Sequence, residues 1–123
     1  MASSKTIRNL IFELPLNYNE QTGLDGIISE LSDKYPVIKR VILYGSKARG
    51  DSLENSDLDL LFITEKDITR QIKSEIYDII YNHELANDII VSAVFIPESD
   101  FKSKINTFIM KVKKEGVVIW SRE

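Results

Sequence analysis

The 123-residue chain contains no cysteine and only one histidine, and these absences exclude whole classes of site. Without cysteine there is no disulfide and no thiolate metal centre. A single histidine, His83, also excludes the histidine clusters that hold zinc. A metal ion bound by this chain must therefore have oxygen ligands, mainly carboxylates, which favours a hard cation such as Mg²⁺.

Long apolar runs and an excess of basic charge are absent too. No run approaches the roughly 20 apolar residues that span a bilayer, and the first residues lack the apolar stretch of a secretory signal. We therefore expect a cytoplasmic protein without a membrane partner. The net charge of −3 and the pI of about 5.2 argue against direct nucleic-acid binding.

The hydrophobic pattern predicts a domain over residues 23–123, preceded by an N-terminal extension over 1–22. In that extension, helical spacing runs from Ile7 to Leu14, Pro15 ends it, and residues 17–22 look like a loop. The extension has no clear structure at this level.

From residue 23 onward, helical and strand patterns alternate. Helical spacing predicts helices over 23–34 and 67–85, and a last one that begins at a Ser99 cap and runs to about 112, before Gly116. Apolar, β-branched runs predict strands over 37–44, 58–64, 89–96 and 117–120. We place the continuous apolar strand 89–96 in the centre of the sheet. This order predicts an α/β (α+β) fold, a mixed sheet with helices packed on it.

Two carboxylates stand where the second predicted strand begins. Asp57 and Asp59 are separated by one residue, so strand alternation puts both on one face, roughly 7 Å apart, while Leu58 and Leu60 face the core. Two carboxylates on one face repel each other unless a cation joins them. They are candidate ligands for a divalent metal that also holds phosphate oxygens.

The loop 45–56, directly before these acids, carries groups suited to phosphate. Gly45 lets backbone approach a ligand, and Ser46 offers a hydroxyl and an N–H where a short helix could start. Lys47 and Arg49 add positive charge. A Gly-Ser pair alone is usually a turn, and an Asp-x-Asp alone is usually a solvated strand end. Their combination in one short segment predicts a site for phosphoryl or nucleotidyl transfer.

These motifs resemble those of a known superfamily. Gly45-Ser46 followed by Asp57-x-Asp59 is similar to the signature of polymerase-β-like nucleotidyltransferases, and the longer string from Leu43 to Leu60 is similar to their minimal nucleotidyltransferase (MNT) branch. That branch includes antitoxins encoded beside HEPN-domain toxins. The ending around Glu115-Gly116-Val117 also resembles the branch.

The resemblance implies a polymerase-β-like fold and a role for each motif. Gly45 and Ser46 would bind nucleotide phosphates, and Asp57 and Asp59 would be the catalytic Mg²⁺ ligands, with a two-metal site as one option. The reaction would transfer a nucleoside monophosphate, AMP from ATP, to an acceptor hydroxyl. In MNT antitoxins that acceptor is a tyrosine of the partner HEPN toxin.

One expected acid is missing. Active family members usually carry a third carboxylate on the third strand, and alignment at Pro97 puts Ser92 there. Serine is not a base near neutral pH. Asp88 shares the parity of Ser92 but lies about 13 Å away along a strand, so we expect it to be a strand-start residue near solvent. Two hypotheses stay open: a nucleotidyltransferase, or a nucleotide-binding module that acts on a toxin by covering it.

Three other features have ordinary interpretations. His83 could be proposed as the base, but it lies on the apolar stripe of its helix, so we expect a packed or partly exposed side chain. The C-terminal lysines could form a nucleic-acid patch, but the outer face of a helix is their ordinary place; they are Lys102, Lys104, Lys111, Lys113 and Lys114. A small-molecule acceptor, as in aminoglycoside nucleotidyltransferases, would require a further helical domain. We therefore expect a partner chain or a homo-oligomer to supply the acceptor surface.

Overall fold

The structure is a computed structural model that describes residues 10–51 and 56–122. The start of the predicted helical spacing at Ile7 lies outside the described residues. The elements in chain order are η1 (Leu10–Glu13), α2 (Tyr18–Lys34), β1 (Ile38–Tyr44), α3 (Ser46–Arg49), β2 (Leu58–Thr64), α4 (Arg70–Asn87), β3 (Val91–Pro97), α5 (Glu98–Ser103), α6 (Thr107–Glu115) and β4 (Val117–Ser121).

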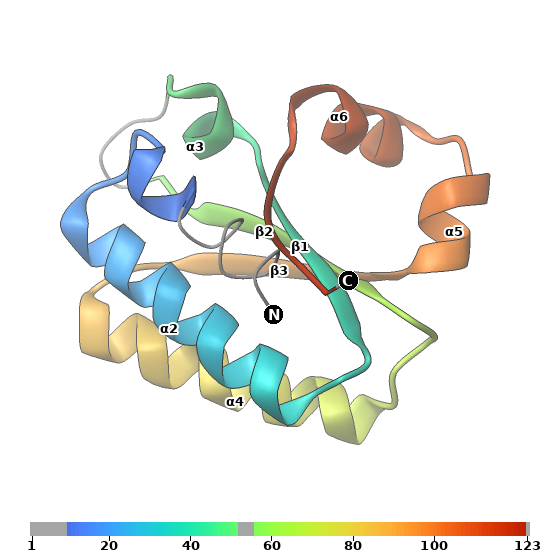
Figure 1. Ribbon diagram of the computed structural model, residues 1–123, viewed down its shortest axis with the longest axis horizontal. Coiled ribbons are helices and arrows are strands. Elements are labelled where there is room, and N and C mark those ends of the chain that lie inside the picture. The colour runs from blue at the N-terminus through green and yellow to red at the C-terminus, as the bar shows by residue number, and fades with distance from the viewer. Residues whose placement is uncertain (1–9, 52–55, 123) are drawn as a thin grey trace.

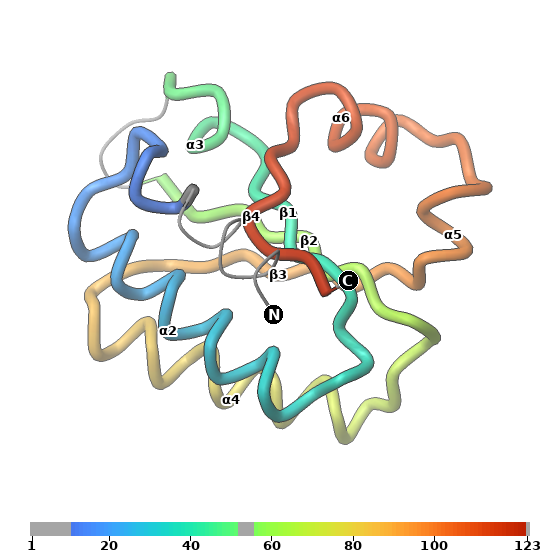
Figure 2. The backbone as a smooth tube through the Cα atoms, in the orientation of Figure 1, coloured from blue at the N-terminus to red at the C-terminus, as the bar shows by residue number. Residues whose placement is uncertain are grey.

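The sheet has four strands in the order β3-β2-β1-β4. β1 pairs antiparallel with β2 and with β4, while β2 and β3 run parallel. Helices α2 and α4 lie together on one side of the sheet, and α5 and α6 lie on the other (Figure 1). Figure 2 shows the last segment, β4, returning beside β1. The predicted α/β fold with a mixed sheet is confirmed.

Both faces of β2 are covered over most of its length. Leu58, Leu60 and Phe62 belong to the larger core under α2 and α4. Leu61 and Ile63 point to the opposite face, into a smaller cluster with residues of α5 and α6. Because Asp59 has the parity of Leu61 and Ile63, it lies on the α5/α6 face, at the end of β2 where that helical cover stops.

The N-terminal part of the domain differs from the prediction. Residues 17–22 are not a loop, because α2 starts at Tyr18 and Asn17 is its N-cap. The Asn17 side chain accepts from the Glu20 amide at 2.8 Å, and the Glu20 carboxylate accepts from the Asn17 amide at 3.0 Å. This capping box satisfies two free amides and fixes the helix start one turn earlier than the apolar spacing indicates. Ile11 and Leu16, upstream, are buried in the core.

The third strand is at the edge of the sheet, so its predicted central position was wrong. The apolar run has another explanation: side chains of β3 pack on both faces of the sheet, Val91, Ala93 and Phe95 against the larger core and Val94 and Ile96 against the smaller cluster. Phe95 stacks on Phe62 at 5.1 Å between ring centroids and meets Tyr77 edge-on at 5.7 Å. The strand also begins later than predicted, at Val91, because α4 runs to Asn87. Asp88 caps that helix in the left-handed conformation, with φ 54°, and is not a strand-start residue.

The C-terminal helical segment is two helices, whereas the pattern predicted one capped by Ser99. Pro97 precedes α5, and Asn106 caps α6 by accepting from the Ile109 amide at 2.9 Å. Gly116 follows α6 as predicted, but its φ of −72° is not left-handed. A side chain there would lie 2.5 Å from the Val112 carbonyl oxygen and 2.7 Å from Ile42 Cγ2, so space, not backbone conformation, requires glycine. No helix among the described residues is long and apolar enough to cross a bilayer.

Candidate active site

Antiparallel pairing of β1 with β2 brings the glycine loop to the carboxylates. Tyr44, the last residue of β1, is the register partner of Asp59. Gly45 follows with φ 76°, a conformation that L-residues with side chains rarely adopt. A Cβ at Gly45 would collide with Asp59 Oδ2. Glycine is therefore required here for two reasons: the backbone conformation of the turn, and the close approach of the Asp59 carboxylate.

Ser46 opens the short helix α3 directly beyond Gly45. The Gly45 carbonyl accepts from the Ala48 and Arg49 amides at 3.1 Å each, which closes the turn. The first amides of a helix have no acceptor within it. The backbone of Ser46 therefore offers a donor group next to its hydroxyl, one residue away from the contact with Asp59.

The surroundings of Asp59 disfavour the charged form of its carboxyl group. Burial raises the pKa of Asp59 above its ordinary value, and the charge of Asp57 raises it further. Lys111 and Arg49 act in the opposite direction, and Glu115 adds a smaller unfavourable charge. Asp57, which precedes β2, is exposed. A cation between Asp57 and Asp59 would relieve this repulsion.

The described residues offer this cation two carboxylates and no larger cluster. No group of three or more His, Cys, Asp or Glu residues among them is placed to hold a metal ion. Mg²⁺ is commonly held by one or two carboxylates, with substrate phosphates and water completing its coordination. Asp57 and Asp59 fit that arrangement, because Gly45 lets the loop backbone come directly against Asp59, so a phosphate chain held by the loop would lie beside the two carboxylates.

Lys47 does not point into this space. Its side chain is 4% exposed, and its Nζ lies 2.6 Å from Glu20 Oε2 in α2. The pair ties α3 to the start of α2 in the interior of the domain. The predicted phosphate contact of the Lys47 side chain has no support in this geometry, although the Lys47 backbone stays within the loop.

Arg49 lies at the surface between two carboxylates. Its Nε is 3.1 Å from Asp51 Oδ2, and its Nη1 is 2.5 Å from Glu115 Oε2 at the end of α6. Hydrogen bonds to Glu115 and then to Asp51 raise the pKa of Arg49, so it stays charged. Arg49 also acts on Asp59, which places its charge next to the predicted phosphate site.

Glu115 and Lys111 are site neighbours that the sequence analysis missed. Both act electrostatically on Asp59, and Lys111 Nζ is 3.8 Å from Glu115 Oε1. The Glu115-Gly116-Val117 string was noticed only as part of a resemblance. The missing information was the pairing of β4 with β1, which carries the end of α6 to the glycine loop.

Ser92 occupies the position next to Asp59 on the neighbouring strand. In the parallel pairing of β2 and β3, Asp59 and Ser92 are register partners, and Ser92 is exposed. The sheet thus puts Ser92 beside Asp59, and its assignment to the place of the third acid stays a prediction. Asp88 lies beyond the end of β3, in the cap of α4.

The remaining alternatives are also placed by the structure. His83 packs between α4 and α2, next to Gly26, with its Nε2 2.9 Å from Glu30 Oε1 and its side chain 22% exposed. It is a packed, partly exposed residue, as expected. The five C-terminal lysines are all exposed, also as expected.

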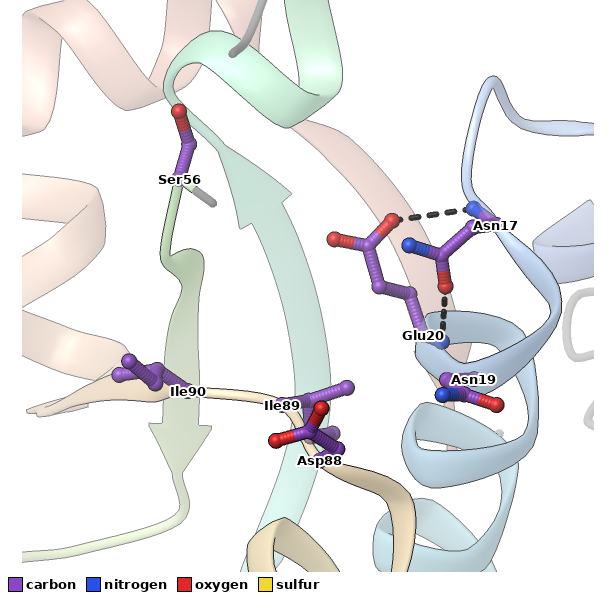
Figure 3. Close-up of a pocket in the computed structure, with 7 residues that line it drawn as sticks. All are labelled: Asn17, Asn19, Glu20, Ser56, Asp88, Ile89 and Ile90. Carbon is purple, nitrogen blue, oxygen red and sulfur yellow. Dashed lines mark hydrogen bonds between the residues drawn. The ribbon is translucent and has the colours of Figure 1, made fainter. Parts of the chain in front are cut away.

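A pocket of about 310 Å³ opens at the same end of the sheet, on the α2 side (Figure 3). Neither Asp57 nor Asp59 lines it. The sequence analysis missed it because it treated the start of α2 as a loop; the Asn-x-x-Glu capping box was the available signal. The lining residues are Asn17, Asn19, Glu20, Ser56, Asp88, Ile89 and Ile90.

Comparison with known proteins places this chain in a family. The model of the nucleotidyltransferase domain family matches residues 24–119, which span both the glycine loop and the two carboxylates. A putative protein adenylyltransferase of Methanocaldococcus jannaschii is 34% identical over 104 residues, covering 83% of this chain and 99% of the relative.

Solved structures share the fold. A toxin–antitoxin crystallised with AMP-PNP superposes with a TM-score of 0.60 at 22% identity, covering 80% of this chain and 73% of that one. A complex of the tri-AMPylated Shewanella oneidensis HEPN toxin with an MNT antitoxin gives a TM-score of 0.56 at 20% identity, covering 83% and 72%. The chain belongs to the nucleotidyltransferase domain family, and the resemblance carried by its Gly-Ser and Asp-x-Asp motifs is confirmed.

Proposed function

We propose that this chain is an Mg²⁺-dependent adenylyltransferase that moves AMP from ATP to a hydroxyl group of a protein partner. The observation that carries the proposal is the contact of Asp59 with the backbone of Gly45. It puts a carboxylate clamp and a phosphate-binding turn at one point of the fold. The relative named as a protein adenylyltransferase supports the choice of AMP and of a protein acceptor.

The residues of the site divide the work of such a transfer. Mg²⁺ held by Asp57 and Asp59 would neutralise phosphate charge and polarise the attacked phosphorus. Ser46 donates from its backbone and hydroxyl to the phosphate chain, and Gly45 lets the loop come directly against Asp59. Arg49, held at the rim by Asp51 and Glu115, adds a positive charge near the leaving pyrophosphate. Catalysis of this kind consists mainly of positioning and charge neutralisation.

The proposed acceptor is a tyrosine of a HEPN-type toxin, which would make the chain an antitoxin. The structural neighbour with an AMPylated HEPN toxin supports this finer proposal. A toxin would supply the acceptor surface that the sequence analysis assigned to a partner chain.

A second function is favoured by one observation, the exposed Ser92 beside Asp59, at the position where the resemblance implies an acid. A chain that lacks a base would transfer AMP slowly or not at all. In that case it would act as a nucleotide-binding antitoxin that covers its toxin.

Labelled ATP separates the two functions. A HEPN toxin is incubated with the chain, Mg²⁺ and either [α-³²P]ATP or [γ-³²P]ATP. The enzyme labels the toxin from the α-phosphate only, and Asp59→Asn abolishes labelling, whereas the exposed Asp67→Asn leaves it unchanged. Label from the γ-phosphate, or equal labelling by Asp59→Asn, would refute AMP transfer at this site. Binding of toxin and ATP without label would favour the covering antitoxin.

A further inference from the structure

The strand order gives the site two unlike sides. Asp59 lies on β2, between β1 and β3. On the β1 side stand the glycine loop and Arg49, the groups proposed to hold phosphate. Among the described residues, the β3 side presents Ser92, which is small and exposed, and β3 is the edge strand of the sheet.

This asymmetry determines the side from which an acceptor approaches. In phosphoryl transfer the attacking and leaving oxygens lie roughly in line on opposite sides of phosphorus. With the pyrophosphate directed to Ser46 and Arg49, the attacking hydroxyl must come from the side of Ser92. Asp59 and Ser92 face the α5/α6 side of the sheet and α4 lies on the other side (Figure 1), so a partner that binds α4 reaches them across the outer edge of β3.

The surface next to that edge is unusually apolar. Tyr81 and Leu85, one turn apart on α4, are 57% and 66% exposed, and Ile90, just before β3, is 59% exposed. We call these three residues the α4 stripe. Two exposed acids flank it: Asp78, on α4, and Asp88, the C-cap of that helix. Apolar side chains with a charged rim are typical of a protein-binding surface.

Helix α4 is joined to β3 by two hydrogen bonds from residues next to the α4 stripe. Glu84 of α4 accepts from the Val91 amide at 2.8 Å, and the Tyr77 hydroxyl donates to the Ala93 carbonyl at 3.4 Å. These hydrogen bonds satisfy the Val91 amide and the Ala93 carbonyl, two backbone groups on the free edge of β3 on either side of Ser92. A partner seated on the α4 stripe is thereby fixed relative to the catalytic edge.

We propose that the acceptor protein docks on the α4 stripe, its basic rim meeting Asp78 and Asp88, and that its hydroxyl reaches the site across β3 beside Ser92. This inference rests on the proposed AMP transfer and adds where the acceptor binds. The acceptor oxygen forms a bond to the α-phosphorus, and the bond from that phosphorus to the bridging oxygen breaks. Pyrophosphate leaves with the electron pair, and the hydroxyl proton passes to water.

Tethered acceptors test the direction of approach. The chain has no cysteine, so Leu85→Cys gives a single anchor on the α4 stripe. Met110→Cys is the matched control, because Met110 is 58% exposed and precedes Lys111 on the other side of the site. Each anchor is joined by a disulfide to the same six-residue peptide ending in tyrosine, which reaches about 20 Å when extended.

With Mg²⁺ and ATP, we expect the Leu85 anchor to give AMP-tyrosine at least about tenfold faster than the Met110 anchor, since tethering raises local concentration only where geometry permits. Mass spectrometry of the released peptide measures it. Equal or faster transfer from Met110 would overturn the proposed approach and leave AMP transfer intact. No transfer from either anchor, while calorimetry shows ATP bound, would refute both.

A free peptide tests the docking surface. The probe is a synthetic peptide with one tyrosine flanked by leucines and lysines. Leu85→Lys is expected to raise the KM for this peptide at least about fivefold, with kcat and ATP affinity unchanged. Ile105→Lys, at a residue 84% exposed on another surface, is the control and should change neither constant. Equal KM values for wild type and Leu85→Lys would show that the acceptor does not bind at the α4 stripe.

Discussion

Asp59 Oδ2 occupies the space that a side chain at Gly45 would fill. The two residues belong to different strands and meet because β1 and β2 pair in a register that places Tyr44 opposite Asp59. The glycine loop and the two carboxylates therefore form one structural unit. A substitution in the loop is expected to displace a carboxylate, and a substitution of a carboxylate is expected to alter the loop.

Gly45→Ala is predicted to abolish ATP binding and to destabilise the fold. The Gly45 backbone, with φ 76° and ψ −159°, lies in a region that is essentially restricted to glycine and costs another residue about 1–3 kcal/mol, and the methyl group would push Asp59 aside. Gly50→Ala is the matched control: its φ is 82°, but among the described residues its Cβ would meet only Pro15 Cγ, at 3.6 Å. Urea unfolding should show both losses of stability, whereas calorimetry should show lost ATP binding for Gly45→Ala alone. If Gly45→Ala binds ATP with normal affinity, the glycine loop does not belong to the ATP-binding site.

Asp59→Asn is predicted to stabilise the metal-free protein. Burial and Asp57 raise the pKa of Asp59 in the folded state, so its charged form costs stability at neutral pH. In EDTA, the free energy of unfolding of the wild type should rise as the pH falls through this raised pKa, and that rise should be smaller in Asp59→Asn. Urea titrations at several pH values measure it. A less stable Asp59→Asn in EDTA would mean that the carboxylate has favourable contacts instead.

Ser92→Asp is predicted to accelerate AMP transfer. Ser92 is the register partner of Asp59 on the open side of the site, and general-base assistance is typically worth about 10²–10⁴-fold. A third acid at this end of the sheet should also lower the stability of the metal-free protein. The rate of labelling from [α-³²P]ATP is compared with that of Ser99→Asp, a control at an exposed serine of α5. A fast wild type that Ser92→Asp does not improve would show that the base lies elsewhere.

The Lys47–Glu20 pair is predicted to be structural. Lys47→Met leaves Glu20 buried and unpaired, which should cost about 3–5 kcal/mol. The double variant Lys47→Met with Glu20→Gln should recover part of that loss, because glutamine keeps an acceptor for the α2 cap without a charge. Differential scanning calorimetry compares the variants. If the folded double variant loses ATP binding, the Lys47 side chain contacts phosphate after all.

The sequence predicted the strands and the site motif because both depend on local pattern. Strand 58–64 was predicted with its observed bounds, and the register partners of Asp59 follow from short, regular strands. The edge position of β3 could not be predicted, since an edge strand whose side chains pack against a helical layer on each face is as apolar as a central one. The break between α5 and α6 was missed because α6 has its own cap, Asn106, whereas Ser99 lies inside α5.

Within the site, the sequence analysis did not predict the ion pairs between residues that are far apart in the sequence. The Lys47 side chain was expected to contact phosphate, but it forms a buried ion pair with Glu20 in α2. Glu115 received no role, yet it pairs with Arg49 across the loop. Both errors come from tertiary pairing, which neither spacing nor composition encodes.

The balance between pyrophosphate and AMP tests AMP transfer most directly. A HEPN toxin and ATP are incubated with wild type or with Asp57→Asn/Asp59→Asn, and released pyrophosphate is compared with AMP found on toxin tyrosine by mass spectrometry. AMP transfer predicts one pyrophosphate for each AMP-tyrosine in the wild type and neither product in the double variant. Tyrosine modified equally by the double variant, or no AMP-tyrosine from a wild type that binds both toxin and ATP, would contradict it.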